Sequence, residues 1–279
     1  MWVQYFGVDL AWGVGSAARP ANESGLVVID ERGVVIDAGW ARGVDEVAEW
    51  ITERMAGGAV VAADGPLVVH NAPRIMRECE REVGRRYGRW GFSAYPSHPG
   101  LGWLSGVALR ERLESAGIAY TDGTRVSAAD ELVMFECYPS TTIVGMPELG
   151  YDERKPRYKG RDPKLSPAES RVTRAAICDE LIQRVATLRD ADPPVDLMSH
   201  PVTAALVSEP SPLSDRVYKH REDLLDAVLC AWTASIWHRH GEARTLILGR
   251  DSEPDESGRR ATIVAPARAE HRAVMPAGR

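Results

Sequence analysis

The sequence has no closely spaced cysteines, no long apolar run and no signal-like N-terminus. Its cysteines form no C-x-x-C pair, which argues against a zinc knuckle or a redox dithiol; they are Cys79, Cys137, Cys178 and Cys230. No stretch approaches 18 apolar residues, so no transmembrane helix is predicted. The opening MWVQYFGVDL lacks the basic and apolar regions of a signal peptide. We therefore expect a cytoplasmic protein with reduced thiols and no membrane association.

Lysine is scarce, because only 4 of the 34 basic residues are Lys, and the formal net charge is −6. A negative protein is not coated by nucleic acid, since nonspecific phosphate binding needs a basic surface. A local basic groove is compatible with this charge. With 44% hydrophobic and 27% charged residues, the composition is that of an ordinary globular protein.

The chain of 279 residues is long enough for one or two domains. It shows no internal repeat and no clear linker, so we expect a single domain over residues 1–265. Polar and proline-rich segments predict insertions at about 67–130 and 152–215. Residues 266–279 are expected to form a flexible tail. The sequence does not indicate an oligomeric state.

Hydrophobic periodicity predicts alternating strands and helices. The expected strands are 3–10, 25–29, 34–40, 59–63, 132–137, 245–248 and 261–265, and the expected helices are 44–55, 73–88, 104–116, 167–189 and 222–240. The segment 190–215, with five prolines, is expected to be irregular. This order predicts an α/β fold with a central mixed sheet, three antiparallel strands and then parallel strands, flanked by helices. It is the ribonuclease H-like order, in contrast to the continuous alternation of a dinucleotide-binding fold.

Acidic residues stand at the ends of predicted strands and within an apolar helix. They are Asp9, Asp64, Glu136, Asp223 and Asp226. A carboxylate beside a core strand is costly unless a cation or hydrogen bonds stabilise it. The i, i+3 spacing places Asp223 and Asp226 on one helix face. Such a set suits a pair of Mg²⁺ or Mn²⁺ ions, which prefer oxygen ligands and can hydrolyse phosphodiesters together.

Each acidic residue also has a structural explanation when it is taken alone. An aspartate at the end of a strand is commonly a turn or capping residue. Asp226 could instead form an ion pair with Arg221 or Arg239. It is the occurrence of all these residues on a matching order of elements that favours a metal site.

The segments GVDLAWG, ADGPLVV, RECERE, ECYPS and LLDAVLCAWTA resemble the family known as domain of unknown function 429 (DUF429). This resemblance covers roughly residues 3–265 and implies a predicted ribonuclease H-like nuclease. The stretch from Asp223 to Ala234 is also similar to the C-terminal active-site helix of RuvC-type resolvases. By that resemblance the metal ligands are Asp9, Asp64 and Asp226, with Asp223 beside them. The second resolvase ligand is a glutamate, whereas here it is Asp64 followed by Gly-Pro, and Glu136 is an additional candidate.

Four residues are candidates for substrate binding. The R-E-C-E-R-E resemblance favours Arg77 and Arg81 as pocket residues, whereas the residues alone favour a solvated helix with i, i+4 ion pairs. Lys159 belongs to a basic loop that either clamps a nucleic-acid backbone or is simply solvated. His98 lies in the proline-rich segment Tyr95–Pro99, where it either contacts substrate or is structural.

The sequence therefore predicts a metal-dependent nuclease that cleaves DNA or RNA by two-metal hydrolysis with Mg²⁺ or Mn²⁺. Asp9, Asp64, Glu136, Asp223 and Asp226 are its expected catalytic set. Two alternatives stay open. One is an actin-like, ATP-dependent phosphotransferase, which shares the opening strands but requires a duplicated domain. The other is a non-catalytic binding protein on the same scaffold.

Overall fold

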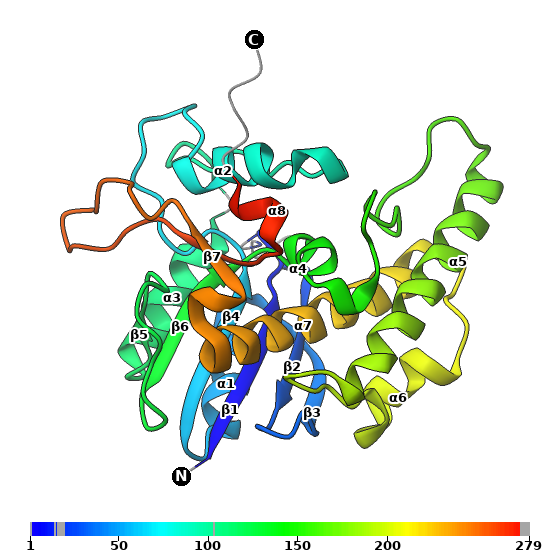
Figure 1. Cartoon of the computed structure of the whole chain (residues 1–279), viewed down its shortest axis with the longest axis horizontal. Coiled ribbons are helices and arrows are strands. Elements are labelled where there is room, and N and C mark those ends of the chain that lie inside the picture. Colours follow the sequence, from blue (N-terminus) through cyan, green and yellow to red (C-terminus); the bar gives the residue numbers. More distant parts are fainter. Residues whose placement is uncertain (1, 14, 16–19, 103, 274–279) are drawn as a thin grey trace.

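The computed structural model describes residues 2–13, 15, 20–102 and 104–273, which form one central sheet with helices on both faces (Figure 1). The strands are β1 (Val3–Asp9), β2 (Glu23–Ile29), β3 (Val35–Arg42), β4 (Gly58–Asp64), β5 (Ala119–Tyr120), β6 (Leu132–Cys137), β7 (Thr245–Leu248) and β8 (Ile263–Pro266). The helices are α1 (Gly43–Arg54), α2 (Glu78–Tyr87), α3 (Ser105–Ser115), α4 (Pro139–Gly145), α5 (Pro167–Ala186), α6 (Pro201–Ser208), α7 (Asp215–His240) and α8 (Ala269–Arg272). Short 3₁₀ turns occur at Gly88–Trp90, Pro147–Leu149, Thr187–Asp190, Leu197–Ser199 and Gly241–Ala243.

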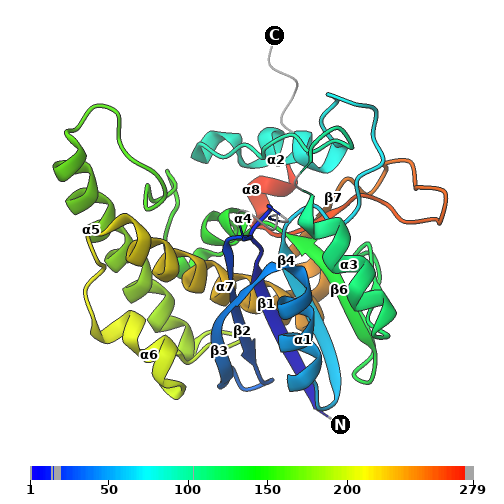
Figure 2. The ribbon, with the colours of Figure 1, turned by 180° about the vertical axis from the view of Figure 1, so that it is seen from behind.

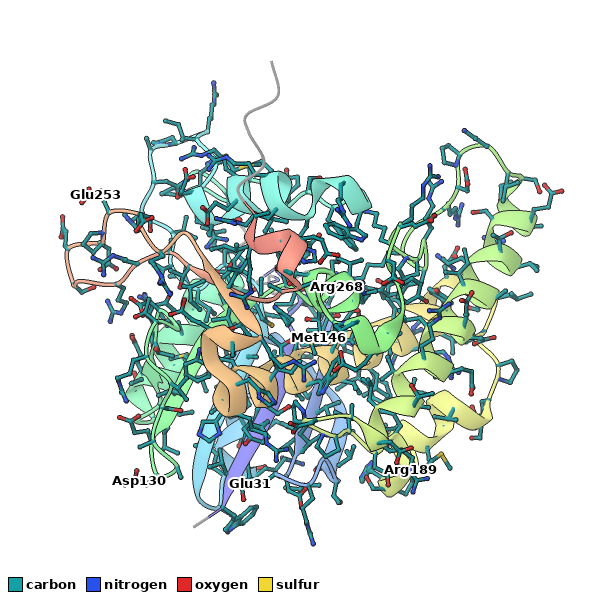
Figure 3. All side chains as sticks on the ribbon, viewed as in Figure 1. Glu31, Asp130, Met146, Arg189, Glu253 and Arg268 are labelled. Atoms are coloured by element: carbon teal, nitrogen blue, oxygen red, sulfur yellow. The ribbon has the colours of Figure 1, made fainter. Side chains whose placement is uncertain are left out.

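The strand order in the sheet is β3-β2-β1-β4-β6-β8-β7, and β5 also pairs with β6. The first three strands are antiparallel, whereas β1, β4 and β6 are parallel neighbours. The predicted α/β class and mixed sheet are therefore confirmed. Parallel neighbours end at the same edge of a sheet, so the carboxyl ends of β1, β4 and β6 lie together. Glu31 and Asp130, labelled in Figure 3, mark the opposite edge in the turns before β3 and β6.

Both faces of the sheet are covered, so β1 and β4 are almost wholly buried and mostly apolar. Helix α7 crosses one face, and α1 with α3 covers the other (Figures 1 and 2). Successive strand residues point to opposite faces. Accordingly, Tyr5 packs in the core beneath α7 with Trp232, while Phe6 packs with Ile51 beneath α1.

Helix α7 lies unusually close to the sheet, because glycines face it. A Cβ atom at Gly7 in β1 would stand 2.0 Å from the Ala227 carbonyl oxygen. A Cβ at Gly25 in β2 would stand 2.2 Å from the Asp223 carbonyl oxygen. Any larger residue at either position would push helix and sheet apart. The two glycines thus bring the Asp223–Ala227 turn of α7 onto the ends of β1 and β2.

Three of the differences from the predicted elements have a clear physical reason. Helix α2 begins at Glu78 and not at residue 73, because Arg74 has a left-handed backbone (φ 64°) that interrupts a helix. Helix α7 begins at Asp215, two turns before the predicted start, since those turns are polar and carry little apolar periodicity. Helix α6 lies in the segment predicted to be irregular, and Pro201 occupies its first turn, where proline is tolerated.

The segment predicted to be a flexible tail begins with ordered structure. Pro266 ends β8, and α8 follows it. The His271 ring stacks between Tyr87 and Trp90, with ring centroids 4.3 and 4.2 Å away, and is fully buried. Residues 274–279 of this predicted tail lie outside the described residues. Among those described, no helix is both long and apolar enough to cross a membrane.

Candidate acidic site

Asp9 and Asp64 lie side by side at the carboxyl edge of the sheet. They are the last residues of β1 and β4, and they are direct partners in the parallel register. Both side chains are partly buried. The sheet itself therefore fixes two carboxylates next to each other, which is an arrangement that costs free energy without a neighbouring positive charge.

Helix α7 adds two more carboxylates to this edge. Asp223 and Asp226 lie on the turn that Gly7 and Gly25 allow against the strands. Asp226 is fully buried. Lys219, one turn earlier, places its Nζ 2.5 Å from Asp223 Oδ1. The structure thus brings Asp9, Asp64, Asp223 and Asp226 to one region, and their role as metal ligands stays a prediction.

Asp226 is held by two residues of the 151–166 loop. The Tyr158 hydroxyl donates a hydrogen bond of 2.6 Å to Asp226 Oδ1, and the Lys159 ammonium contacts Asp226 Oδ2. Tyr158 is itself buried, and its carbonyl accepts a 2.6 Å hydrogen bond from the Tyr218 hydroxyl. Lys159, predicted to bind substrate, therefore reaches the acidic site directly. The Arg221 guanidinium, in contrast, donates to the carbonyls of Leu206 and Glu209.

Negative charge exceeds positive charge in this region. Burial raises the pKa of Asp9 well above its usual range, and the charges of Asp226 and Asp64 raise it further. Burial likewise raises the pKa of Asp64 to about 7, although the Lys159 ammonium opposes this shift. Glu222 also contacts the Lys219 ammonium, at 3.0 Å, so five carboxylates face the ammonium groups of Lys159 and Lys219, which leaves a formal excess of three negative charges. Further positive charge would stabilise the ionised site.

The raised pKa of Asp64 predicts how stability depends on pH. An unfolded aspartate releases its proton near pH 3.8, whereas folded Asp64 keeps it up to about pH 7. The contribution of Asp64 protonation to the free energy of unfolding is therefore complete below pH 3.8, and it is lost as the pH rises through 7. In EDTA, we expect Asp64→Asn to be about 2 kcal/mol more stable than the wild type at pH 8, and the gain to shrink by pH 5. Urea unfolding at both pH values measures this difference.

Asp130→Asn is the control, because Asp130 is exposed at the opposite edge of the sheet. It should change the free energy of unfolding by less than about 0.5 kcal/mol at either pH. A lower stability of Asp64→Asn at pH 8 would contradict the charge imbalance described here.

Glu136, the further acidic candidate on β6, is committed to a buried ion pair. Arg77 binds it with both terminal nitrogens, at 2.8 and 2.7 Å, and donates from Nε to Glu80 at 2.8 Å. All three side chains are almost completely buried. Arg77, predicted to contact substrate, is thus saturated by two carboxylates of its own chain.

This ion-pair cluster also fixes the backbone around the acidic site. Glu136 accepts a 3.0 Å hydrogen bond from the backbone nitrogen of Leu67, three residues after Asp64. Glu80 accepts 3.1 Å hydrogen bonds from the backbone nitrogen of Ser97. The cluster lies beside the acidic residues. It therefore fixes the loop that follows β4, and with that loop the position of Asp64.

Arg81 and His98, the remaining predicted substrate contacts, lie outside the acidic group. Arg81 is exposed and pairs with Glu78 at 2.6 Å. His98 Nδ1 accepts a 3.2 Å hydrogen bond from the Gly100 backbone, which closes a local turn. Neither residue lines the hollows beside Asp9 or Asp64.

Sequence reasoning missed several residues that complete this region. Lys219 precedes Asp223 by four residues, and Glu80 follows Arg77 by three. This is the spacing of ion pairs in a helix, so the sequence could have indicated both contacts. Tyr158 gives no such signal, because its contact with Asp226 joins a loop to a distant helix. Trp12 lines hollows on both sides of the acidic pair. It lies in the loop after the first strand, where no periodic pattern could have indicated its role.

The fold and site define a mixed α/β protein with an acidic cluster at the carboxyl edge of its sheet. Residues 7–252 match the family described as Protein of unknown function (DUF429), and the chain belongs to that family. No curated protein matches the sequence. The family resemblance seen in the sequence motifs is thereby confirmed.

Proposed function

We propose that this chain is a ribonuclease H-like, divalent-metal-dependent phosphodiesterase that acts on nucleic acid. The observation that carries the proposal is the convergence of Asp9, Asp64, Asp223 and Asp226 with an excess of negative charge. The order of three antiparallel strands followed by parallel ones supports the fold assignment. Carboxylates crowded together at a sheet edge are typical of a site that binds a cation.

The chemistry of these residues fits Mg²⁺ or Mn²⁺, since all four supply hard oxygen ligands. Asp226 Oδ2 is buried and makes no hydrogen bond with the described residues; its contact is with the Lys159 ammonium. In the same part of the chain, no three acidic, His or Cys side chains are arranged to hold a metal as they stand. Asp226 is held by the Tyr158 hydroxyl and the Lys159 ammonium. A metal ion bound to Asp226 Oδ2 would therefore replace the Lys159 ammonium there.

The residues divide into ligands and supports. Asp9, Asp64 and Asp226 would hold the metal, which when bound activates water and neutralises charge on the phosphate. Lys219 holds Asp223 beside them. Lys159, once displaced from Asp226, is within reach of a phosphate oxygen bound at the same place. The Arg77–Glu136 pair keeps the loop after Asp64 in position.

The test is a cleavage assay with end-labelled single-stranded, duplex, hybrid and branched substrates in Mg²⁺, Mn²⁺ or EDTA. We expect cleavage of at least one substrate with either metal, none in EDTA, and an increase in melting temperature on adding the metal. Asp9→Asn should lose both responses.

Two results would sink the proposal. One is that every substrate stays intact with both metals, which favours a non-catalytic binding protein. The other is undiminished cleavage by Asp9→Asn, which would assign the activity elsewhere or to a contaminant. Stabilisation by ATP with Mg²⁺, but not by Mn²⁺ alone, would favour the phosphotransferase alternative.

A further inference from the structure

Two hollows flank the acidic residues at the carboxyl edge of the sheet. The larger, of about 560 Å³, reaches Asp9 and is lined among others by Trp12, Arg42, Arg216, Lys219 and Asp223. The smaller, of about 220 Å³, reaches Asp64 and is lined among others by Trp12, Tyr95 and Tyr138. Since Asp9 and Asp64 are register partners, the hollows lie on either side of one carboxylate pair. Trp12 belongs to both.

The smaller hollow is distinguished by its aromatic residues. Trp12 and Tyr95 meet edge to face, with ring centroids 6.2 Å apart. The Tyr95 side chain remains 59% exposed, which leaves most of a flat ring uncovered at the rim of the hollow. Exposed aromatic rings beside a polar site are stacking platforms for nucleobases, because every base has a π-face. A base in a duplex is already stacked and paired, so it cannot reach such a platform without being extruded.

The larger hollow is distinguished by its basic residues. Arg42 pairs with Glu23 at 2.7 Å, and Lys219 pairs with Asp223, so these charges are already balanced. Arg216, exposed in the first turn of α7, has no ion pair with any residue that the structure describes. Its guanidinium is available to bind a phosphate through two parallel hydrogen bonds. This charge lies in the hollow on the Asp9 side, which Tyr95 and Tyr138 do not line.

We propose that the two hollows together bind an unpaired stretch of single-stranded nucleic acid across the acidic pair. One base stacks against Trp12 and Tyr95 on the Asp64 side, and a neighbouring phosphate binds Arg216 on the Asp9 side. The backbone between them crosses Asp9 and Asp64. This inference rests on the proposed function and specifies its substrate as single-stranded, which the acidic residues alone do not.

Fluorescence anisotropy with a labelled single strand of about 12 nucleotides, a length within the usual range of such sites, tests the inference. Binding is measured in EDTA and again in Ca²⁺, so that it is read apart from cleavage. We expect the single strand to bind at least tenfold more tightly than a blunt duplex of the same sequence and than a mononucleotide.

Matched variants assign the binding to the named residues. Trp12→Ala and Tyr95→Ala should each raise the Kd for the single strand about tenfold, as expected for one stacked base, whereas Trp12→Phe should retain most of the affinity. Arg216→Ala should weaken binding and reduce the slope of log K against log salt by about one. Trp2→Ala and Arg32→Ala are controls of the same residue types, exposed at the opposite edge of the sheet, and should leave the Kd unchanged.

Equal affinity for single strand and duplex, an equally tight mononucleotide, or an unchanged Kd for Trp12→Ala would each overturn the inference. So would the absence of binding in both EDTA and Ca²⁺. Single-strand binding without any cleavage in Mg²⁺ or Mn²⁺ supports this inference and overturns the proposed function. Cleavage confined to duplexes supports the proposed function and overturns this inference, so the two failures are distinguishable.

Discussion

Asp226→Asn is expected to reduce metal-dependent cleavage by at least about 10³-fold, the scale of loss seen when a group central to catalysis is removed. Asp226 is fully buried, and one of its oxygens makes no hydrogen bond with the described residues. Asparagine has the same shape and retains an acceptor for the Tyr158 hydroxyl, but it removes the charge that would hold a cation. The loss should therefore reside in kcat and metal affinity, with the fold preserved.

Initial rates across a series of Mn²⁺ concentrations, together with circular dichroism, measure this effect. Asp130→Asn is the control, because Asp130 is exposed at the opposite edge of the sheet. It should leave cleavage within about twofold, since Asp130 lies far from the acidic site. Full activity of Asp226→Asn would remove this residue from the ligand set.

Arg77→Ala is expected to destabilise the fold by about 3–5 kcal/mol, because it leaves Glu136 and Glu80 buried without their partner. Burial already raises the pKa of Glu136 even with Arg77 present. Removing the guanidinium also withdraws its 3.1 Å hydrogen bond to the Val68 carbonyl. The expected signature is a lower midpoint of urea unfolding with an unchanged slope.

Arg81→Ala is the control for this prediction, since Arg81 forms an exposed pair at the same end of α2 and should cost less than about 1 kcal/mol. Should Arg77→Ala fail to fold, Arg77→Lys retains the charge without the two-pronged geometry and should give an intermediate loss. Adding Glu136→Gln to Arg77→Met should recover part of the stability, because fewer buried charges then lack a partner. A cost below about 1 kcal/mol for Arg77→Ala would show that the cluster does not support the fold.

The acidic residues could be found from the sequence because their local patterns are strong. Asp9 and Asp64 end apolar strands, and Asp223 and Asp226 share a helix face, so parallel strands and one covering helix suffice to bring them together. Glu136 gives the same strand-end signal. Its partner Arg77 is 59 residues away in the sequence. No local pattern therefore indicates that Glu136 is ion-paired and not free to bind a metal.

The position of Lys159 illustrates a second limit. A basic, proline-containing loop has no periodicity, so the sequence leaves open whether it is solvated or binds a substrate. Its course is set by the buried Tyr158, which donates to the Asp226 carboxylate and accepts from the Tyr218 hydroxyl, both on the distant helix α7. Contacts of this kind arise from tertiary packing, which single-sequence patterns do not encode.

The close packing of α7 on Gly7 and Gly25 also has a consequence for folding during synthesis. Tyr5 and His238, which share a 3.0 Å hydrogen bond across this contact, are 233 residues apart in the chain. The apolar face of β1, β2 and β4 leaves the ribosome long before the helix that shields it from water. Pairings between residues so far apart in the sequence form slowly, and the apolar face is prone to aggregation until they form. Because Asp223 and Asp226 lie on α7, the acidic cluster is complete only when this helix packs on the sheet.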